Sequence, residues 1–89
     1  MKKIHITGKA CNEYDEPVAE ISLALAGSFM RFGSSEEHVI HKLDIFIDRL
    51  KLGKPFELDE ADLKMFRNIV LACDAAQIVK SPVLKILDN

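Results

Sequence analysis

His38 and His41 come closest in the sequence to a chemical motif. They are three positions apart in a segment with helical periodicity, so they would occupy neighbouring positions on one helix face. Asp44 or Asp48 could add a carboxylate to the pair, but a zinc site needs three or four converging ligands and the HExxH pattern is absent. The pair therefore predicts at most a weak metal site, the alternative being two solvated histidines. No cofactor is expected.

Nucleophilic catalysis would require a nucleophile held against a base. Cys73 with one of the histidines is the only cysteine arrangement to consider, and Cys73 falls on the apolar side of a helical stretch, where a thiol is inert. Nucleophile-elbow, P-loop and dinucleotide-binding patterns are absent. We therefore expect that the protein is not an enzyme.

The two cysteines also bear on the compartment. Cys11 and Cys73 lie far apart with no CxxC motif, which favours free thiols and a reducing, cytoplasmic location. No run of residues approaches the about 18–20 apolar positions of a membrane-spanning helix, so no membrane association is expected.

Basic residues near the N-terminus suggest an alternative function, the binding of nucleic acid. Lys2, Lys3 and Lys9, together with the basic residues of the second helical segment, could contact phosphates. The net charge of −2 and the acidic turn that follows Asp59 oppose this reading. Nucleic acid is therefore the less favoured partner.

Glycines, prolines and helical periodicity predict an all-α fold with a single domain over residues 1–89. Three main helices, at about 16–32, 35–52 and 60–80, would form a compact bundle. Ser34 is expected as the N-cap of the second helix, with Gly53 just past its end, and Asp59 as the N-cap of the third.

The two ends of the chain are less regular. Residues 3–7 alternate like a strand, but a lone strand has nothing to pair with, so we expect an extended N-terminal arm or pairing with the copy in a second subunit. Pro82 is expected to stop the third helix and to begin a short C-terminal helix over residues 81–87.

Apolar residues make up 48% of the 89 positions, which is slightly more than one small core needs. Phe46 and Phe66 fall on the inner faces of the predicted helices and are expected to be buried. The surplus falls on the outer sides, at Ile45, Leu52, Leu71 and Ile78.

The outer side of the second helix carries a mixed strip of aliphatic and basic residues. It comprises His38, His41, Lys42, Ile45, Arg49 and Leu52. Aliphatic residues and arginine flanked by polar groups are typical of protein interfaces, so these residues are predicted to bind a partner. The open alternative is that one of the termini folds over the strip.

These patterns together predict a small, non-enzymatic protein–protein interaction module. Such a protein would regulate, inhibit or assemble a partner protein, and the apolar outer sides also predict self-association into a homo-oligomer. A small helical chain without catalytic motifs is compatible with regulators carried by bacteria or phages, including inhibitors of host systems.

Overall fold

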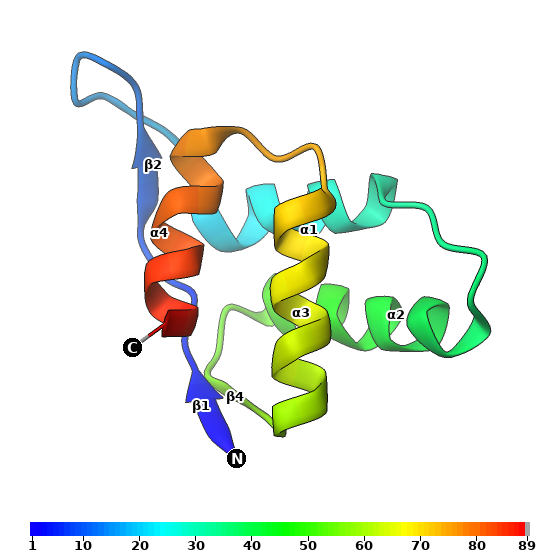
Figure 1. Ribbon diagram of the computed structural model, residues 1–89. Helices are drawn as coiled ribbons and strands as arrows, with labels where there is room; N and C mark the ends of the chain where they lie inside the picture. The colour runs from blue at the N-terminus through cyan, green and yellow to red at the C-terminus, as the bar shows by residue number, and fades with distance from the viewer. Residues whose placement is uncertain (89) are drawn as a thin grey trace.

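The structure, a computed structural model, describes residues 1–88, which form four helices and four short strands. The helices are α1 (Ile21–Arg31), α2 (Glu37–Leu52), α3 (Glu60–Ala72) and α4 (Gln77–Asp88). The strands are β1 (Lys2–Ile4), β2 (Lys9–Cys11), β3 (Pro17–Glu20) and β4 (Phe56–Leu58). α1 and α2 run side by side, α3 crosses both, and α4 stands beside β2 (Figure 1).

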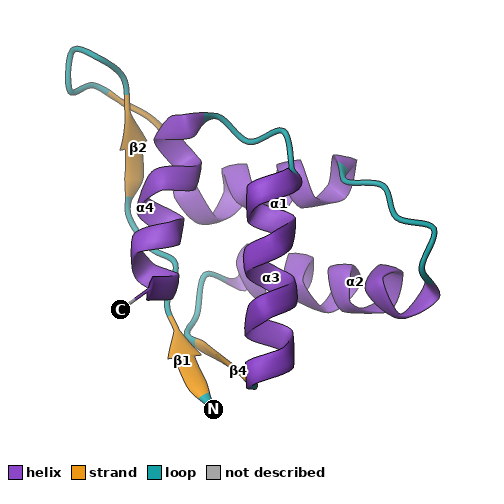
Figure 2. Cartoon of the chain, viewed as in Figure 1, coloured by secondary structure: helices purple, strands orange, loops and turns teal. Residues whose placement is uncertain are grey.

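The strands form two antiparallel pairs, so the expected all-α fold is wrong and the protein is a mixture of helices and small sheets (Figure 2). β1 pairs with β4, from Lys2 opposite Leu58 to Ile4 opposite Phe56. The N-terminal arm is therefore a strand, and its partner lies within the same chain. Residues 3–7 show the alternation of a strand, but the partner strand lies more than half the sequence away, so no local pattern predicted the pairing.

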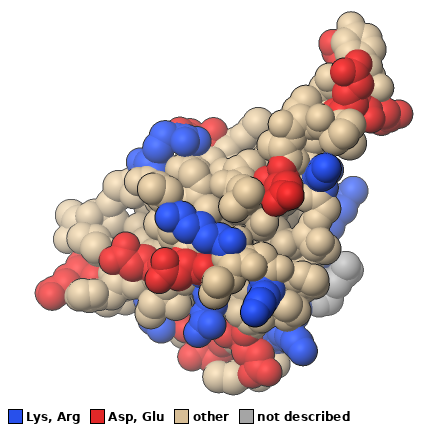
Figure 3. Space-filling model, turned by 180° about the vertical axis from the view of Figure 1, so that it is seen from behind, with Lys and Arg blue, Asp and Glu red and all other residues tan. Residues whose placement is uncertain are grey.

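β2 and β3 form a hairpin that projects from the body of the protein (Figures 1 and 3). Its loop is held by Asn12, whose Oδ1 accepts the backbone N–H groups of Tyr14 at 2.9 Å and Glu16 at 3.0 Å. The expected helix start near residue 16 is wrong, because Pro17–Glu20 form strand β3 instead. The helix begins at Ile21, whose N–H donates to the Gly8 carbonyl at 3.1 Å.

Two of the three expected helix caps are confirmed. The Asp59 side chain accepts the N–H of Asp62 at 2.7 Å, and Gly53 adopts the left-handed conformation, with φ at 68°, that ends α2. Ser34 is not the N-cap of α2. Its hydroxyl accepts the N–H of Glu36 at 3.2 Å in the preceding loop, and the helix begins at Glu37, two residues later than expected.

The helix expected over 60–80 is two helices. α3 ends at Ala72, Cys73 is extended, and α4 starts at Gln77 and contains Pro82, which therefore neither stops nor starts a helix. The break lets α4 bury Val79, Val83 and Leu87 beside α1 and α3, which a straight continuation of α3 could not do. Tertiary packing thus overrides the continuous apolar pattern.

The core is centred on Phe66, which is fully buried in α3. Its ring centroid lies 5.2 Å from that of Phe29, 5.1 Å from Phe46 and 6.0 Å from Phe56. The predicted burial of Phe46 and Phe66 is confirmed. Tilted and edge-on aromatic pairs of this kind add about 0.5–1.5 kcal/mol each to the burial of the rings. One aromatic residue thereby joins α1, α2 and β4.

Candidate functional site

Three large aliphatic residues of α2 are exposed, and two of them, Ile45 and Leu52, lie on the same side of the helix with exposed fractions of 48% and 61%, while Ile40, 44% exposed, lies on another side. Ile45 and Leu52 are seven positions apart, which is close to two helical turns, so they lie in line along the helix. Charged and polar residues surround them on the same side, while Leu43, Phe46 and Leu50 occupy the buried side. An apolar line therefore runs along the middle of an otherwise polar helix face.

Neither described end of the chain covers this line. The N-terminal arm pairs with β4. His5 in this arm also donates from Nε2 to the Gly53 carbonyl at 3.2 Å, just beyond the end of α2. α4 packs beside α1, α3 and β2 instead. Within residues 1–88, Ile45 and Leu52 thus remain open to solvent.

A small hollow of about 280 Å³ on this side of α2 is lined by four exposed residues: Ile45, Asp48, Arg49 and Leu52. The two aliphatic side chains supply apolar walls, and the charged ones supply a carboxylate and a guanidinium. Neither Asp48 nor Arg49 forms an ion pair with another described residue. The hollow therefore suits a group with an apolar body that also offers a hydrogen-bond donor or a face for the guanidinium.

The structure gathers only part of the predicted strip. Ile45, Arg49 and Leu52 come together in the hollow. Lys42 turns to α3 instead, where its Nζ lies 3.0 Å from Asp62 Oδ2. Asp48, which the sequence prediction considered only as a metal ligand, is the missed member of the hollow. Its position one turn after Ile45 could have identified it.

His38 and His41 are exposed on α2, and each lies near a glutamate at the N-terminal end of this helix. His38 Nδ1 lies 4.0 Å from Glu36 Oε2, and His41 Nε2 lies 3.7 Å from Glu37 Oε1. Among residues 1–88, no group of three or more histidine, cysteine, aspartate or glutamate side chains is placed to hold a metal ion. The geometry thus brings no third ligand to the histidines.

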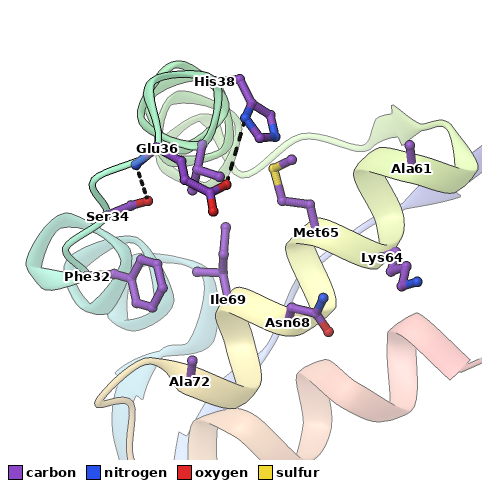
Figure 4. A pocket seen from close by; sticks show the side chains of 11 residues that line it. Phe32, Ser34, Glu36, His38, Ala61, Lys64, Met65, Asn68, Ile69 and Ala72 are labelled. Atoms are coloured by element: carbon purple, nitrogen blue, oxygen red, sulfur yellow. Dashed lines mark hydrogen bonds and ion pairs between the residues drawn. The ribbon is translucent and has the colours of Figure 1, made fainter.

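A second hollow, of about 450 Å³, lies between the start of α2 and α3 and was not predicted (Figure 4). Met65 and Ile69 project into it from α3, facing Phe32 (Figure 4). Its polar rim includes Lys64 and His38, which also stands on the exposed side of α2. Glu36 lies on the same rim, so charges of both signs are present and this second hollow shows no preference for one ligand charge.

The lysines of the nucleic-acid alternative are dispersed. Lys2 donates from Nζ to the Leu87 carbonyl, and Lys3 stands opposite Glu57 in the β1–β4 pair. Lys9 stands opposite Glu20 in the hairpin. Two of the three lysines therefore face a glutamate across a strand pair.

One ion pair ties α1 to the connection between α3 and α4. Arg31 Nε lies 2.8 Å from Asp74 Oδ2, and a second guanidinium nitrogen lies 3.2 Å from Oδ1. The hydrogen bonds from Arg31 hold the pKa of Asp74 below its usual value, and those to Asp74 raise the pKa of Arg31. Both side chains are exposed, so this ion pair lies at the protein surface.

None of the helices in the described part of the chain is long and apolar enough to cross a membrane. Comparisons of the chain with protein families, with curated proteins and with solved structures found no match.

Proposed function

We propose that the protein is a non-enzymatic interaction module that binds a partner protein through the exposed side of α2. The observation that carries this proposal is the alignment of Ile45 and Leu52, both open to solvent, beside Arg49. Aliphatic anchors next to arginine and within a polar rim make up the usual centre of a protein interface. Covering the two side chains would add to the binding free energy by the hydrophobic effect.

The shape of the hollow favours a protein over a small molecule. Small-molecule sites are concave enough to bury most of their ligand, whereas this hollow is lined by four exposed residues of a single helix. Cys73, the nucleophile considered from the sequence, is buried and its Sγ donates to the Val70 carbonyl at 3.3 Å. A regulator, inhibitor or assembly factor fits these features better than an enzyme does.

The cytoplasm is the compartment that we propose for this activity. Cys11 is exposed and Cys73 is buried, and both are free thiols. An exposed free thiol persists most readily in a reducing compartment.

The proposal is tested by capturing partners from source-cell extract with four tagged chains. These are the wild type, Ile45→Asp, Leu52→Asp and the control Leu71→Asp, which makes the same change at an exposed leucine of α3. We expect the wild type and Leu71→Asp to retain the same partner and both α2 variants to lose it, with unchanged helical circular dichroism. Equal retention by all four chains would contradict the proposal.

A further inference from the structure

We propose that the hollow on α2 receives the β2–β3 hairpin of a second copy of this chain, with Tyr14 inserted between Ile45 and Leu52. This inference rests on the proposed function, since it names the occupant of the same surface.

The hairpin presents its tip away from the body of the protein (Figure 1). Tyr14 stands in this tip with 73% of its surface exposed. The two hydrogen bonds that Asn12 Oδ1 accepts fix the loop around it. A loop ordered in advance loses little conformational entropy on binding, and tyrosine offers a large contact area with few rotatable bonds. The tip is therefore a preorganised anchor with nothing to anchor to in its own chain.

Each group that lines the hollow has a counterpart on a tyrosine side chain. Ile45 and Leu52 provide apolar walls for the ring. The Arg49 guanidinium can stack on the ring face, and the Asp48 carboxylate can accept the phenol O–H. An aliphatic anchor would use only the apolar walls, whereas an aromatic side chain that carries a hydroxyl matches all four residues that line the hollow.

The hairpin tip is acidic, whereas the C-terminal end of α2 is mainly basic, although Asp48 lines the hollow itself. The hairpin segment 12–20 contains four acidic residues and no basic one: Glu13, Asp15, Glu16 and Glu20. The acidic side chains gather at the projecting tip in the space-filling view (Figure 3). The end of α2 carries Arg49 and Lys51, and the loop that follows carries Lys54; all three are exposed and none forms an ion pair with another described residue. Complementary charge of this kind orients the approach of the two surfaces.

A second copy is the occupant that these features favour, because each chain carries both surfaces and a two-fold dimer makes the contact twice. Direct packing of two α2 faces about a two-fold axis is less favourable, since residues near such an axis meet their own copies. Asp48 would approach Asp48, and Arg49 would approach Arg49. Strand addition at β3 is also disfavoured, because Pro17, the register shift beside Cys11 and the glutamates blunt that edge.

Tyr14 gives a direct readout, because the chain has one tyrosine and no tryptophan. The Leu52→Asp chain keeps the fluorescent hairpin but has an altered hollow. The Tyr14→Ala chain is silent at the tyrosine wavelength but keeps the hollow intact. We expect each variant alone to self-associate at least about tenfold more weakly than the wild type, because each loses a central anchor.

Mixing the two variants should restore one of the two contacts. Titrating the Tyr14→Ala chain into the Leu52→Asp chain is expected to raise the fluorescence anisotropy of Tyr14 and to protect it from acrylamide quenching. The silent double variant Tyr14→Ala/Leu52→Asp is the matched control and should change neither signal. Ile45→Asp in place of Leu52→Asp repeats the test without changing the last residue of α2.

The inference would be overturned by no change on mixing chains whose circular dichroism is native, or by a Tyr14→Ala chain that sediments as a dimer like the wild type. A wild type that remains a monomer at every concentration would do the same. The proposed function would survive these results if Ile45→Asp and Leu52→Asp still lost a different captured partner. It would fall separately if capture were unaffected.

Discussion

The two long sides of α2 place neighbouring residues in opposite environments. Phe46 is 1% exposed and stands 5.1 Å, ring to ring, from Phe66, whereas Ile45 is 48% exposed with only solvent beyond it. Both side chains are large and apolar, and they differ by one step of about 100° around the helix. The difference shows that position relative to α1 and α3, and not residue type, decides which apolar groups stabilise the fold.

The two sides therefore hold apolar surface for different purposes. Burial of Phe46 has already lowered the free energy of the folded chain, while the apolar surface of Ile45 and Leu52 can be removed from water only by another contact. A mutation on the inner side should change the free energy of unfolding, and a mutation on the outer side should change association. Three experiments, ordered by expected effect on stability, test this division.

The largest effect is expected at the aromatic centre of the inner side. Phe66→Ala should lower the free energy of unfolding by about 3–5 kcal/mol, because it removes a buried ring that contacts three others and leaves a cavity. Urea unfolding followed by circular dichroism measures the change. A loss below about 1 kcal/mol would show that the inner side is loosely packed and would remove the contrast between the two sides.

A much smaller effect is expected on the outer side. Ile45→Asp and Leu52→Asp should each change the free energy of unfolding by no more than about 0.5 kcal/mol, because both positions face solvent. The measurement is urea unfolding at a protein concentration low enough to keep the chain monomeric. If both variants had already lost their helical signal in the absence of urea, Ile45 and Leu52 would be internal and the hollow would not be a free surface.

The smallest effect is expected from an exposed ion pair, which sharpens the comparison by testing a surface contact made within the chain. Because the pKa of Asp74 is lowered in the folded protein, its ionised carboxylate stabilises the fold above about pH 4. This stabilisation is lost as the pH falls through the pKa that Asp74 has in the folded state. Asp74→Asn should therefore be slightly less stable than the wild type at pH 7. The difference should shrink at acidic pH.

Urea unfolding at pH 7 and at pH 2.5 compares the two chains. Solvent around both side chains screens the pair, so the difference at neutral pH should be well below that of Phe66→Ala. A difference that widened on acidification would mean that the folded protein does not hold Asp74 in its charged form.

Local signals predicted much of the helical part of the fold. Helical spacing placed Phe46 and Phe66 in the core and put Ile45 and Leu52 on the outer side. Asp59 and Gly53 cap their helices as expected, because each acts on backbone groups within a few residues. Features whose cause lies nearby in the chain were thus readable from the sequence.

Features whose cause lies far away in the chain were not readable. β1 is a strand because residues 56–58 lie beside it, and α3 is separate from α4 because α4 must reach α1. For the same reason the sequence placed Lys42 in the outer strip, although its ammonium group pairs with Asp62 of α3 in the structure. The sequence did not predict the hairpin that carries Tyr14, because its strands are short and its acidic loop resembles the start of a helix.

The pairing of β1 with β4 has a consequence for the order in which the chain can fold during synthesis. Ile4 reaches its partner Phe56 only after 52 further residues have been made, which at about 5–20 residues per second takes some seconds. Until then Ile4 and Ile6, both buried in the finished protein, have no strand to join. Residues 4–6 thus leave the ribosome seconds before their partner strand does, and in that interval they are accessible to chaperones and to neighbouring chains.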